Sequence, residues 1–354
     1  MAVARSGWCR RHGGCWSASL VVALCLVLLG IGSAAAADRP SARETPIRFG
    51  ILPIGSAAES LEQWRPLLED LQKRLDRQVT TVSVGSYASL SSAIGGQRVD
   101  VAFLSGKLAV EAVTRQNMRV FAQFLRSDGA PGNVATLVVR NDSPIRNLDD
   151  LLSTPGQGWR YARSEQLSVT GYIAPEAYVF APNGLNSDTF FASVRVGDHQ
   201  SNLLAVVNRE ADVTSSNNPD MDLFRRNFPS EAAQLRVIWR SRLIPSGVLV
   251  IREGMPRQLR QKLTRILLDY GKARGAGGER ERTILARIPD LGGFVAVDSR
   301  VLKPFVDMQY TLLQQQASHG QWVSPRALQD QLARIEREHQ QTLRLLSPRE
   351  DAGQ

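Results

Sequence analysis

The sequence predicts an α/β protein of two lobes, with crossings between them and a helical C-terminus. Short apolar runs alternate with segments whose apolar residues recur at three- and four-residue steps, as strands and amphipathic helices do. The alternation occurs in two successive blocks. A later apolar run at residues 247–252 then indicates that the chain returns to the first block. Two crossings between two α/β lobes predict a hinged clamshell.

The first residues have the features of an export signal. Arginines precede an uninterrupted apolar run at residues 20–31, and residues 33–37 are small, as in an A-x-A cleavage site. The apolar run is shorter than the ~20 residues that a spanning helix needs. We therefore favour a cleaved signal peptide over residues 1–37, rather than an uncleaved anchor, and predict a periplasmic protein.

Composition excludes several classes of function. All three cysteines (Cys9, Cys15 and Cys25) lie in the leader, so the exported chain would have no thiol for a disulfide, a metal or a nucleophile. The formal net charge of +9 fits an anionic partner, although surface arginines alone produce the same count. Aromatic residues make up 6% of the chain and are not interleaved with basic blocks, which argues against nucleic acid.

The first block begins with a buried apolar run that ends at Pro53. We expect strands at residues 47–52, 79–84 and 99–104, with helices at residues 57–75 and 87–94 between them. Strands that alternate with helices predict a parallel sheet, whose ligand crevice lies at the carboxyl ends of the strands.

The second block repeats this pattern. Strands are expected at residues 135–140, 158–162, 193–196, 211–214 and 236–239. A short helix should follow the first of these strands, and longer helices should begin near Thr170 and Gln200.

The C-terminal part reads as helices near residues 256–270, 302–315 and 325–346, the last with Ser324 as N-cap and Pro325 at N1. The apolar stripe of this last helix is interrupted at His339, which favours packing on its own lobe and leaves pairing with another chain open.

These elements suggest a division into lobes. Lobe 1 takes residues 46–135 and 247–320, and lobe 2 takes residues 136–246. A C-terminal helix follows at residues 324–347.

The stretch LSVTGY at residues 167–172 places hydroxyl groups and a glycine at a predicted helix start. The first N–H groups of a helix lack intrahelical partners and carry a partial positive charge. Ser168 and Thr170 would add hydroxyl donors there, which is typical of an oxyanion site. These residues alone favour an ordinary N-cap over an oxyanion site, because Ser and Thr cap most helices. A second helix start one βα unit later carries His199, whose imidazole can donate to an anion, although an isolated histidine is more often structural.

Several stretches in the same order and spacing resemble the PhnD-type periplasmic binding proteins of phosphonate ABC transporters. They are FGILPIGSAAES, VGSYASLSSAIGGQRVDVAFLSGKLAVEAV, VFAQFLRSDGAPG, SVTGY with PEAYVFAPNG, GDHQSNLLAVVNREADV and LRVIWRSRLIPSG. The resemblance implies a type II periplasmic-binding-protein clamshell that closes on a phosphonate, needs no cofactor and passes its ligand to an inner-membrane permease.

The resemblance also implies the ligand-binding residues. Ser168 and Thr170 would be hydroxyl donors, His199 would be the second donor of lobe 2, and Tyr87 would close from lobe 1. Val169 stands where the family has a hydroxyl, so only its backbone N–H remains.

Other positions also depart from the family. Asn133 replaces the usual aromatic after DGAPG, and Gly247 stands where aminoalkylphosphonate binders have an aspartate. Asp220 is the remaining acid for a ligand ammonium, although the alignment there is uncertain by one residue. Because a desolvated ammonium needs carboxylate partners, we expect an oxyanion without a required amine: phosphate, phosphite, a simple alkylphosphonate or an organosulfur anion.

Two other functions compete with transport. Asp198, His199 and Ser168 resemble a hydrolase triad on paper, but no G-x-S-x-G or H-E-x-x-H motif occurs, so we expect no enzyme. A periplasmic subunit that senses the same anion for a membrane receptor stays open. The spacing of the acids and His199 predicts no metal site.

Overall fold

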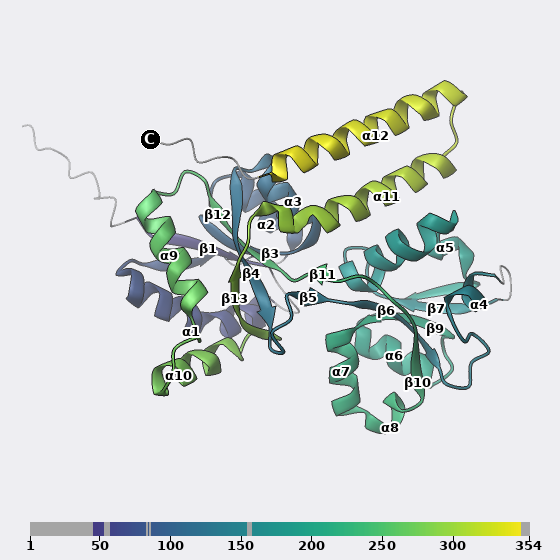
Figure 1. Cartoon of the computed structure of the whole chain (residues 1–354), viewed down its shortest axis with the longest axis horizontal. Helices are drawn as coiled ribbons and strands as arrows, with labels where there is room; N and C mark the ends of the chain where they lie inside the picture. The colour runs from purple at the N-terminus through teal and green to yellow at the C-terminus, as the bar shows by residue number, and fades with distance from the viewer. Residues whose placement is uncertain (1–44, 53–56, 83, 85, 154–157, 348–354) are drawn as a thin grey trace, which may run out of the picture. The chain divides into compact units, whose positions relative to one another are not determined.

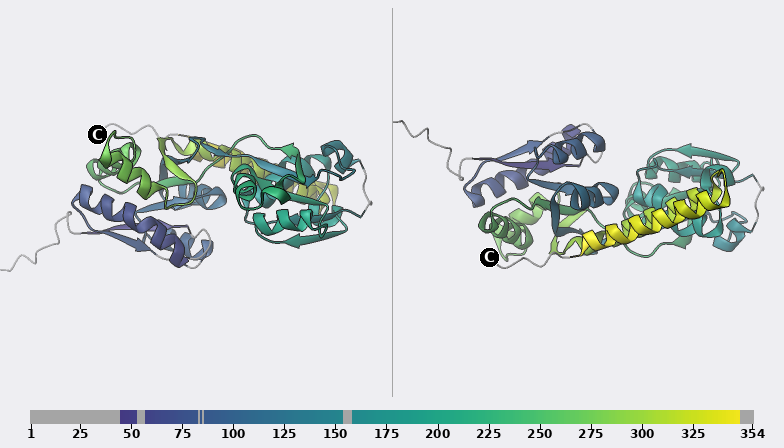
Figure 2. Two further views of the ribbon diagram at one scale, coloured as in Figure 1. Left: turned by 90° about the horizontal axis from the view of Figure 1, so that it is seen from below. Right: turned by 90° about the horizontal axis from the view of Figure 1, so that it is seen from above.

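The computed structural model describes residues 45–52, 57–82, 84, 86–153 and 158–347, which leaves the predicted leader outside the described part. The chain forms two mixed β-sheets, each covered by helices (Figures 1 and 2). None of the helices in the described residues is both long and apolar enough to cross a membrane. The predicted α/β architecture, with two sheets and two crossings between them, is observed.

The first sheet has six strands in the order β13-β4-β12-β3-β1-β2. They are β1 (Ile47–Ile51), β2 (Val79–Val82), β3 (Val101–Leu104), β4 (Met118–Arg126), β12 (Val248–Arg252) and β13 (Leu291–Ala296). Its helices are α1 (Ala57–Leu75), α2 (Tyr87–Gly95), α3 (Gly106–Arg115), α9 (Arg257–Asp269) and α10 (Ala276–Leu285). Trp64 of α1 lies at the centre of the core, with its ring 5.4 Å from both Phe49 and Phe103.

The second sheet has five strands in the order β10-β6-β9-β7-β8. They are β6 (Ala135–Arg140), β7 (Arg160–Arg163), β8 (Ser193–Val196), β9 (Val213–Asn217) and β10 (Leu235–Arg240). Its α-helices are α4 (Leu148–Leu152), α5 (Ser187–Phe190), α6 (His199–Val207), α7 (Asn218–Asn227) and α8 (Pro229–Ala232). A further helix over residues 169–183 contains two π-helical turns, η1 (Val169–Ile173) and η2 (Glu176–Phe180), and ends in the 3₁₀ turn η3 (Ala181–Asn183). We call it the 169–183 helix.

The expected parallel pairing holds for β1–β3 and for β7–β9, but each sheet also contains antiparallel strands. Strand β1 is parallel to β2 and β3, and β7 is parallel to β8 and β9. The strands that join the two sheets run the other way: β12 is antiparallel to β3 and β4, and β6 is antiparallel to β9 and β10. The chain enters β6 and β12 from the other sheet, and not through a crossover helix of their own sheet. Parallel neighbours need such a crossover, so these two strands can pair antiparallel.

Two crossings connect the sheets, and they pair with each other. Strand β5 (Gly132–Asn133) follows β4, β11 (Ile244–Pro245) precedes β12, and the two form a short antiparallel ladder. The backbones are so close that a Cβ on Gly132 would lie 2.2 Å from the Ile244 carbonyl oxygen. Glycine is therefore required at the crossing for steric reasons.

Both sheets contain the same Arg–Asp clamp, which the sequence reading missed. Arg48 of β1 donates its backbone N–H (2.9 Å) and its Nε (2.8 Å) to Asp100, which stands just before β3. Arg160 of β7 does the same to Asp212, just before β9, at 2.8 Å and 3.0 Å. In each sheet the clamp therefore fixes the register between the first strand and its parallel neighbour.

The C-terminal helices form a hairpin. Turn η4 (Ser299–Leu302) leads into α11 (Lys303–His319), and α12 (Pro325–Leu346) packs back on α11 with Ser324 as its N-cap (Figure 1). His339 of α12 stacks on Tyr310 of α11 at 4.1 Å between ring centroids and bonds Asp307 at 3.0 Å. The histidine that interrupts the apolar stripe is thus the polar contact between the two helices.

Candidate functional site: three helix starts at one sheet edge

Three helices of the five-stranded sheet begin where its parallel strands end. The 169–183 helix follows β7, α6 follows β8 and α7 follows β9, with Ser168, Asp198 and Asn217 as their N-caps. Each start has N–H groups without intrahelical acceptors and the positive end of its dipole. The carboxyl edge of this sheet is therefore suited to an anion.

Ser168 caps the 169–183 helix. Its hydroxyl accepts from the Gly171 N–H at 3.2 Å, while its carbonyl accepts from both Tyr172 and Ile173, the second contact being the wider π-helical bond. The simpler N-cap interpretation therefore describes this residue, yet the hydroxyl hydrogen stays available to a ligand. Gly171 is needed for close packing, because a Cβ there would lie 2.3 Å from the Ser164 hydroxyl oxygen.

Asn217 joins the three helix starts. Its amide nitrogen lies 3.0 Å from the Thr170 hydroxyl, 3.2 Å from His199 Nε2 and 2.7 Å from the Asp220 carboxylate. Three of the predicted residues, Thr170, His199 and Asp220, thus surround one side chain. Thr170 is buried, and the side chains of His199 and Asp220 are only partly exposed. Hydrogen bonds between buried and partly buried groups are electrostatically stronger than hydrogen bonds on an open surface.

The acids beside this cluster have different tasks. Asp198 is the N-cap of α6, and its pKa is lowered chiefly because its carboxylate accepts the Ser201 N–H. His199 Nδ1 faces the Ser215 carbonyl at 3.4 Å, and its Nε2 lies 3.8 Å from Asp220. Because Asp198 does not orient the imidazole, the hydrolase triad imagined from sequence is not formed.

The side chain of Val169 serves packing, so only the backbone N–H of this residue can donate. Its side chain packs against the core of the six-stranded sheet, and a Cβ on Gly106 at the start of α3 would lie 3.1 Å from its Cγ2. Val169 therefore contacts the six-stranded sheet and the start of α3 from the first turn of the 169–183 helix.

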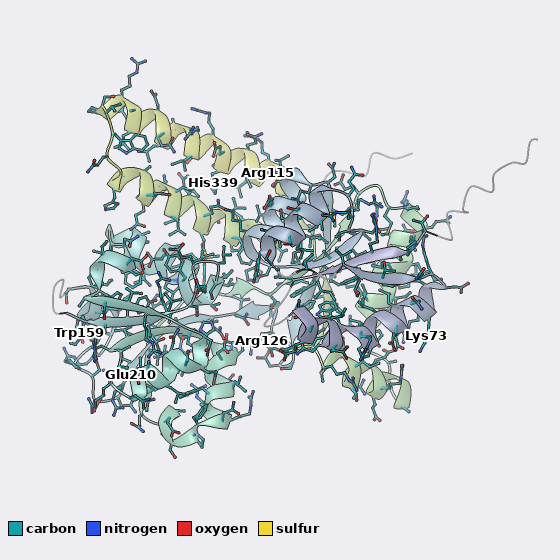
Figure 3. The ribbon with its side chains drawn as sticks, turned by 180° about the vertical axis from the view of Figure 1, so that it is seen from behind. Lys73, Arg115, Arg126, Trp159, Glu210 and His339 are labelled. Carbon is teal, nitrogen blue, oxygen red and sulfur yellow. The ribbon has the colours of Figure 1, made fainter. Side chains whose placement is uncertain are left out.

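The structure does not join Tyr87 and Asn133 to this cluster. Tyr87 is the first residue of α2 and is 40% exposed, with no hydrogen bond recorded to the described residues of the three helix starts. Asn133 lies in the β5–β11 crossing, where its side-chain oxygen accepts from Arg126 at 3.3 Å. Figure 3 shows Arg126 where strands pass between the two sheets.

Asn217, which contacts three of the predicted residues, was not expected at this site from the sequence. The sequence shows only a small polar run at the end of a strand, and Asn217 lay in the segment whose alignment was uncertain. Its position as N-cap, directly before Asn-Pro, was the available signal. Ser164 was missed as well: it is buried after β7, with a hydroxyl that has no partner among the described residues.

Gly247 cannot carry a side chain in this arrangement. A Cβ there would lie 2.2 Å from the Phe103 ring and 3.2 Å from the Leu104 carbonyl oxygen. An aspartate at this position would require the Phe103 ring to move. The packing of the core is thus adapted to the absence of that carboxylate.

A cavity of about 520 Å³ lies elsewhere, between α3, α11 and α12. Lys107, Glu111, Arg115 and His339 contribute its polar lining, and Figure 3 labels Arg115 and His339 on these helices. Its size would admit a small ligand, but its lining contains opposite charges and none of the predicted binding residues. The cavity is distinct from the sheet edge where the three helices start.

Comparison with known proteins identifies the family. Residues 49–302 match the family described as ABC transporter, phosphonate, periplasmic substrate-binding protein. The chain belongs to this family. The predicted resemblance is thereby confirmed. The protein is a periplasmic substrate-binding component of an ABC transporter, and not an enzyme.

Relatives of this periplasmic phosphonate-binding family agree with the assignment. The phosphonates-binding periplasmic protein of Escherichia coli (strain K12) is 33% identical over 246 residues, covering 70% of this chain and 71% of the relative. The binding component of an ABC phosphonate transporter from Pseudomonas aeruginosa is 28% identical, with a TM-score of 0.67 over 85% of this chain and 97% of that one.

A more distant structure shares the fold. PhnD1 from Prochlorococcus marinus (MIT 9301), solved in complex with methylphosphonate, is 17% identical and superposes with a TM-score of 0.59, covering 75% of this chain and 97% of that one.

Among the described residues of this chain, no cluster of histidine, cysteine and acidic side chains is arranged to hold a metal ion.

Proposed function

We propose that this protein captures a phosphonate-like oxyanion, namely phosphonate, phosphite or phosphate, at the three helix starts of the five-stranded sheet. The observation that carries the proposal is the convergence of Thr170, Asn217 and His199 at that edge. Ser168, with the N–H groups of Val169 and Thr170, adds donors from the 169–183 helix. Fixed donors of this kind bind an anion without reorganisation, because the fold already holds them in place.

The lobes we assign are residues 46–135 with 247–320, and residues 136–246. Tyr87 belongs to the first of these, and we expect its phenol to reach the ligand only when the lobes close. Closure is then a population shift, since only the closed state lets both lobes contact the ligand.

The organic part of the ligand should be small and should not require an ammonium group. Gly247 offers no carboxylate, and Val169 presents an apolar surface to the first lobe. Asp220 is the one acid next to the cluster that could hold an amine, and Asn217 and His199 already contact it. Phosphite, phosphate or a simple alkylphosphonate fits this chemistry better than an aminoalkylphosphonate.

A thermal-shift and calorimetric screen tests the proposal. Phosphate, phosphite, methylphosphonate, 2-aminoethylphosphonate and sulfate are added to the purified protein. A ligand at 100 times its Kd should raise the free energy of unfolding by about 2.7 kcal/mol. Thr170→Val should weaken binding about 10- to 100-fold, because a hydrogen bond to a charged group contributes ~1.5–3 kcal/mol.

Thr283→Val is the matched control, since the Thr283 hydroxyl bonds only within the exposed helix α10. The proposed site would be contradicted if none of these anions stabilised the protein. It would also be contradicted if Thr170→Val bound the anion as tightly as the wild-type protein does. Tight binding of 2-aminoethylphosphonate that is lost on Asp220→Ala would contradict the ligand class alone.

We further propose that the leader is cleaved after Ala37 and that the liganded protein delivers its anion to an inner-membrane permease. Mass spectrometry of the exported protein measures the cleavage. Ligand-dependent stimulation of the ATPase of the permease encoded beside this gene would support delivery. A neighbouring receptor gene with no permease would favour the sensing role instead.

A further inference from the structure

The excess positive charge of this chain lies in one segment. Residues 257–287, which contain α9 and α10, have nine lysines or arginines and three acids, a net charge of +6 against +9 for the whole chain. The predicted leader has three more arginines and no acid, so the rest of the chain contains as many acids as bases. The basic character of the protein is therefore concentrated in residues 257–287, which we call the α9–α10 region.

The cations of the α9–α10 region face solvent. Leu263 and Leu267 bury the inner face of α9, and both helices pack on β13 of the six-stranded sheet. Figure 1 shows α9 and α10, in green, beside α1. Arg257 and Arg265 are exposed on the outer face of α9, with Gln261 between them at four-residue steps. Four further cations of the region are also exposed: Lys262, Lys272, Arg274 and Arg287.

Few of these cations have an acidic partner. Arg280 pairs with Asp70 of α1 at 2.8 Å, and the buried Glu281 pairs with Arg74 of the same helix. The other two acids of the region, Asp269 and Glu279, are exposed. The remaining cations have no ion pair within 4.0 Å among the residues that the structure describes; they are Arg257, Arg260, Lys262, Arg265, Lys272, Arg274, Arg282 and Arg287.

The start of α9 adds to this unbalanced charge. Its first turn contains no acid, and its N-cap, Pro256, makes no side-chain hydrogen bond. Arg257 and Arg260 instead lie next to the positive end of the helix dipole, where a cation is unfavourable. Within the folded chain nothing offsets this repulsion, whereas a negatively charged partner outside the chain would.

We propose that the α9–α10 region adsorbs the protein to a membrane surface that contains anionic phospholipids. In residues 257–287, all of which the structure describes, no large apolar side chain is exposed. The core of a specific protein–protein interface uses aromatic and apolar anchors and is depleted in lysine. A sheet of lipid phosphates needs no such anchor, because it attracts a polybasic surface by charge alone.

Adsorption of this kind suits a substrate-binding component of an ABC transporter. The permease of such a transporter lies in a membrane, so a protein held loosely at the lipid surface meets it by diffusion in two dimensions. The attraction is screened by salt, which keeps the adsorption reversible. The inference does not depend on which anion the protein carries.

Cosedimentation with lipid vesicles tests the proposal. The protein is purified after export, so that the apolar leader cannot insert into the vesicles. One set of vesicles contains equal parts of phosphatidylglycerol and phosphatidylcholine, and the other contains phosphatidylcholine alone. We expect binding to the first set at low salt, no binding to the second, and release at about 1 M salt, where the screening length falls to about 3 Å.

Two charge-matched variants locate the surface. The first removes four exposed cations of the α9–α10 region that make no side-chain hydrogen bond to the described residues: Arg257→Gln, Arg265→Gln, Lys272→Gln and Arg274→Gln. A basic side chain near an anionic surface contributes about fivefold to binding, so the loss of Arg257 and Arg265 alone should weaken adsorption about 25-fold.

The second variant removes the same charge from the exposed side of α12, where acids alternate with bases: Arg326→Gln, Arg334→Gln, Arg337→Gln and Arg344→Gln. It should adsorb within about threefold of the wild-type protein, because these residues lie outside the basic region. Thermal unfolding of both variants checks that the fold is retained.

Three outcomes would overturn the proposal. The first is that the wild-type protein does not bind phosphatidylglycerol vesicles at low salt. The second is equal binding to vesicles of phosphatidylcholine alone, and the third is an equal loss of binding in the two variants, since net charge alone would then account for the adsorption. If vesicles do not bind but an acidic protein does so through Arg257 and Arg265, the region recognises a protein surface instead.

Discussion

At the scale of single residues, the site depends on side chains that hold one another. Asn217 is at once the N-cap of α7 and the neighbour of Thr170 and His199. Gly171 lets the 169–183 helix pack against Ser164. In the proposed site, the atoms that would bind the ligand therefore also have structural roles. Each residue alone is for that reason compatible with an ordinary N-cap or packing role in the sequence.

Gly171→Ala should disturb both roles. The added Cβ would lie 2.3 Å from the Ser164 hydroxyl oxygen and 2.8 Å from the Ser168 hydroxyl oxygen. Overpacking of this kind typically costs about 1–3 kcal/mol, and displacing Ser168 should also weaken binding of the oxyanion. Urea unfolding and calorimetry measure the two effects.

Gly254→Ala is the control for this change, since nothing lies within 4 Å of a Cβ there. Ser164→Gly combined with Gly171→Ala should recover part of the stability, because it removes the group that clashes. Wild-type stability of Gly171→Ala alone would show that the turn tolerates a side chain.

At the scale of elements, each sheet is held in register by an Arg–Asp clamp across its parallel strands. Asp100 is 4% exposed and is bonded by Arg48 and by Arg252 of β12. Burial raises the pKa of Asp100, but the hydrogen bonds from Arg48 and the charge of Arg252 outweigh it, so the net shift is downward. The same balance lowers the pKa of Asp212 beside Arg160.

Asp100→Asn should destabilise the protein by about 3 kcal/mol at pH 7, because breaking a buried pair leaves charge without a partner. An aspartate in the unfolded chain titrates near ~3.9. Since the folded pKa is lower, the stabilisation is complete above that pH and is lost as the pH falls through the folded pKa. Urea midpoints at pH 7 and pH 3 measure this.

The variant should therefore lose less stability on acidification than the wild-type protein does. Glu62→Gln, at an exposed ion pair with Arg65, is the matched control and should change stability by less than about 0.5 kcal/mol. If Asp100→Asn lowered the free energy of unfolding by as little as Glu62→Gln, the Arg–Asp clamp would not hold the register of the strands.

At the scale of the whole molecule, the two large sheets are connected by two crossings that pair with each other. Strands β5 and β11 form a ladder of two residues each, and Asn133 within it bonds Arg126 of β4. The next residue, Val134, donates to the side chain of Asn218, which follows the central Asn217. The crossing is thus linked by a hydrogen bond to the start of α7, at the edge of the five-stranded sheet where the proposed site lies.

Gly132→Ala should therefore affect binding without contacting the ligand. Its Cβ would meet the Ile244 carbonyl at 2.2 Å, which cannot be relieved by moving a side chain. We expect a loss of about 1–3 kcal/mol in stability, a higher Kd for methylphosphonate and a smaller ligand-induced change in the radius of gyration by small-angle scattering.

Gly277→Ala is the control, because its Cβ would enter open space in α10 and alanine favours a helix. If Gly132→Ala left both the affinity for methylphosphonate and the ligand-induced change in the radius of gyration unchanged, the crossing would have no part in ligand-driven closure.

The sequence by itself determined the two-lobed fold, the positions of most strands and helices, and the family. Hydrophobic periodicity and N-cap residues are local signals, and ordered motifs identify a family without coordinates. The sequence also marked Ser168, Thr170 and His199 as residues at helix starts.

Only the tertiary structure decided that β12 lies antiparallel between β3 and β4, that Val169 packs on the first lobe, and that Asn217 joins Thr170 to His199. These facts depend on pairs of residues far apart in the chain. One sequence gives no sign of which distant segments meet, because the packing free energy that brings them together belongs to the assembled core and not to either segment alone.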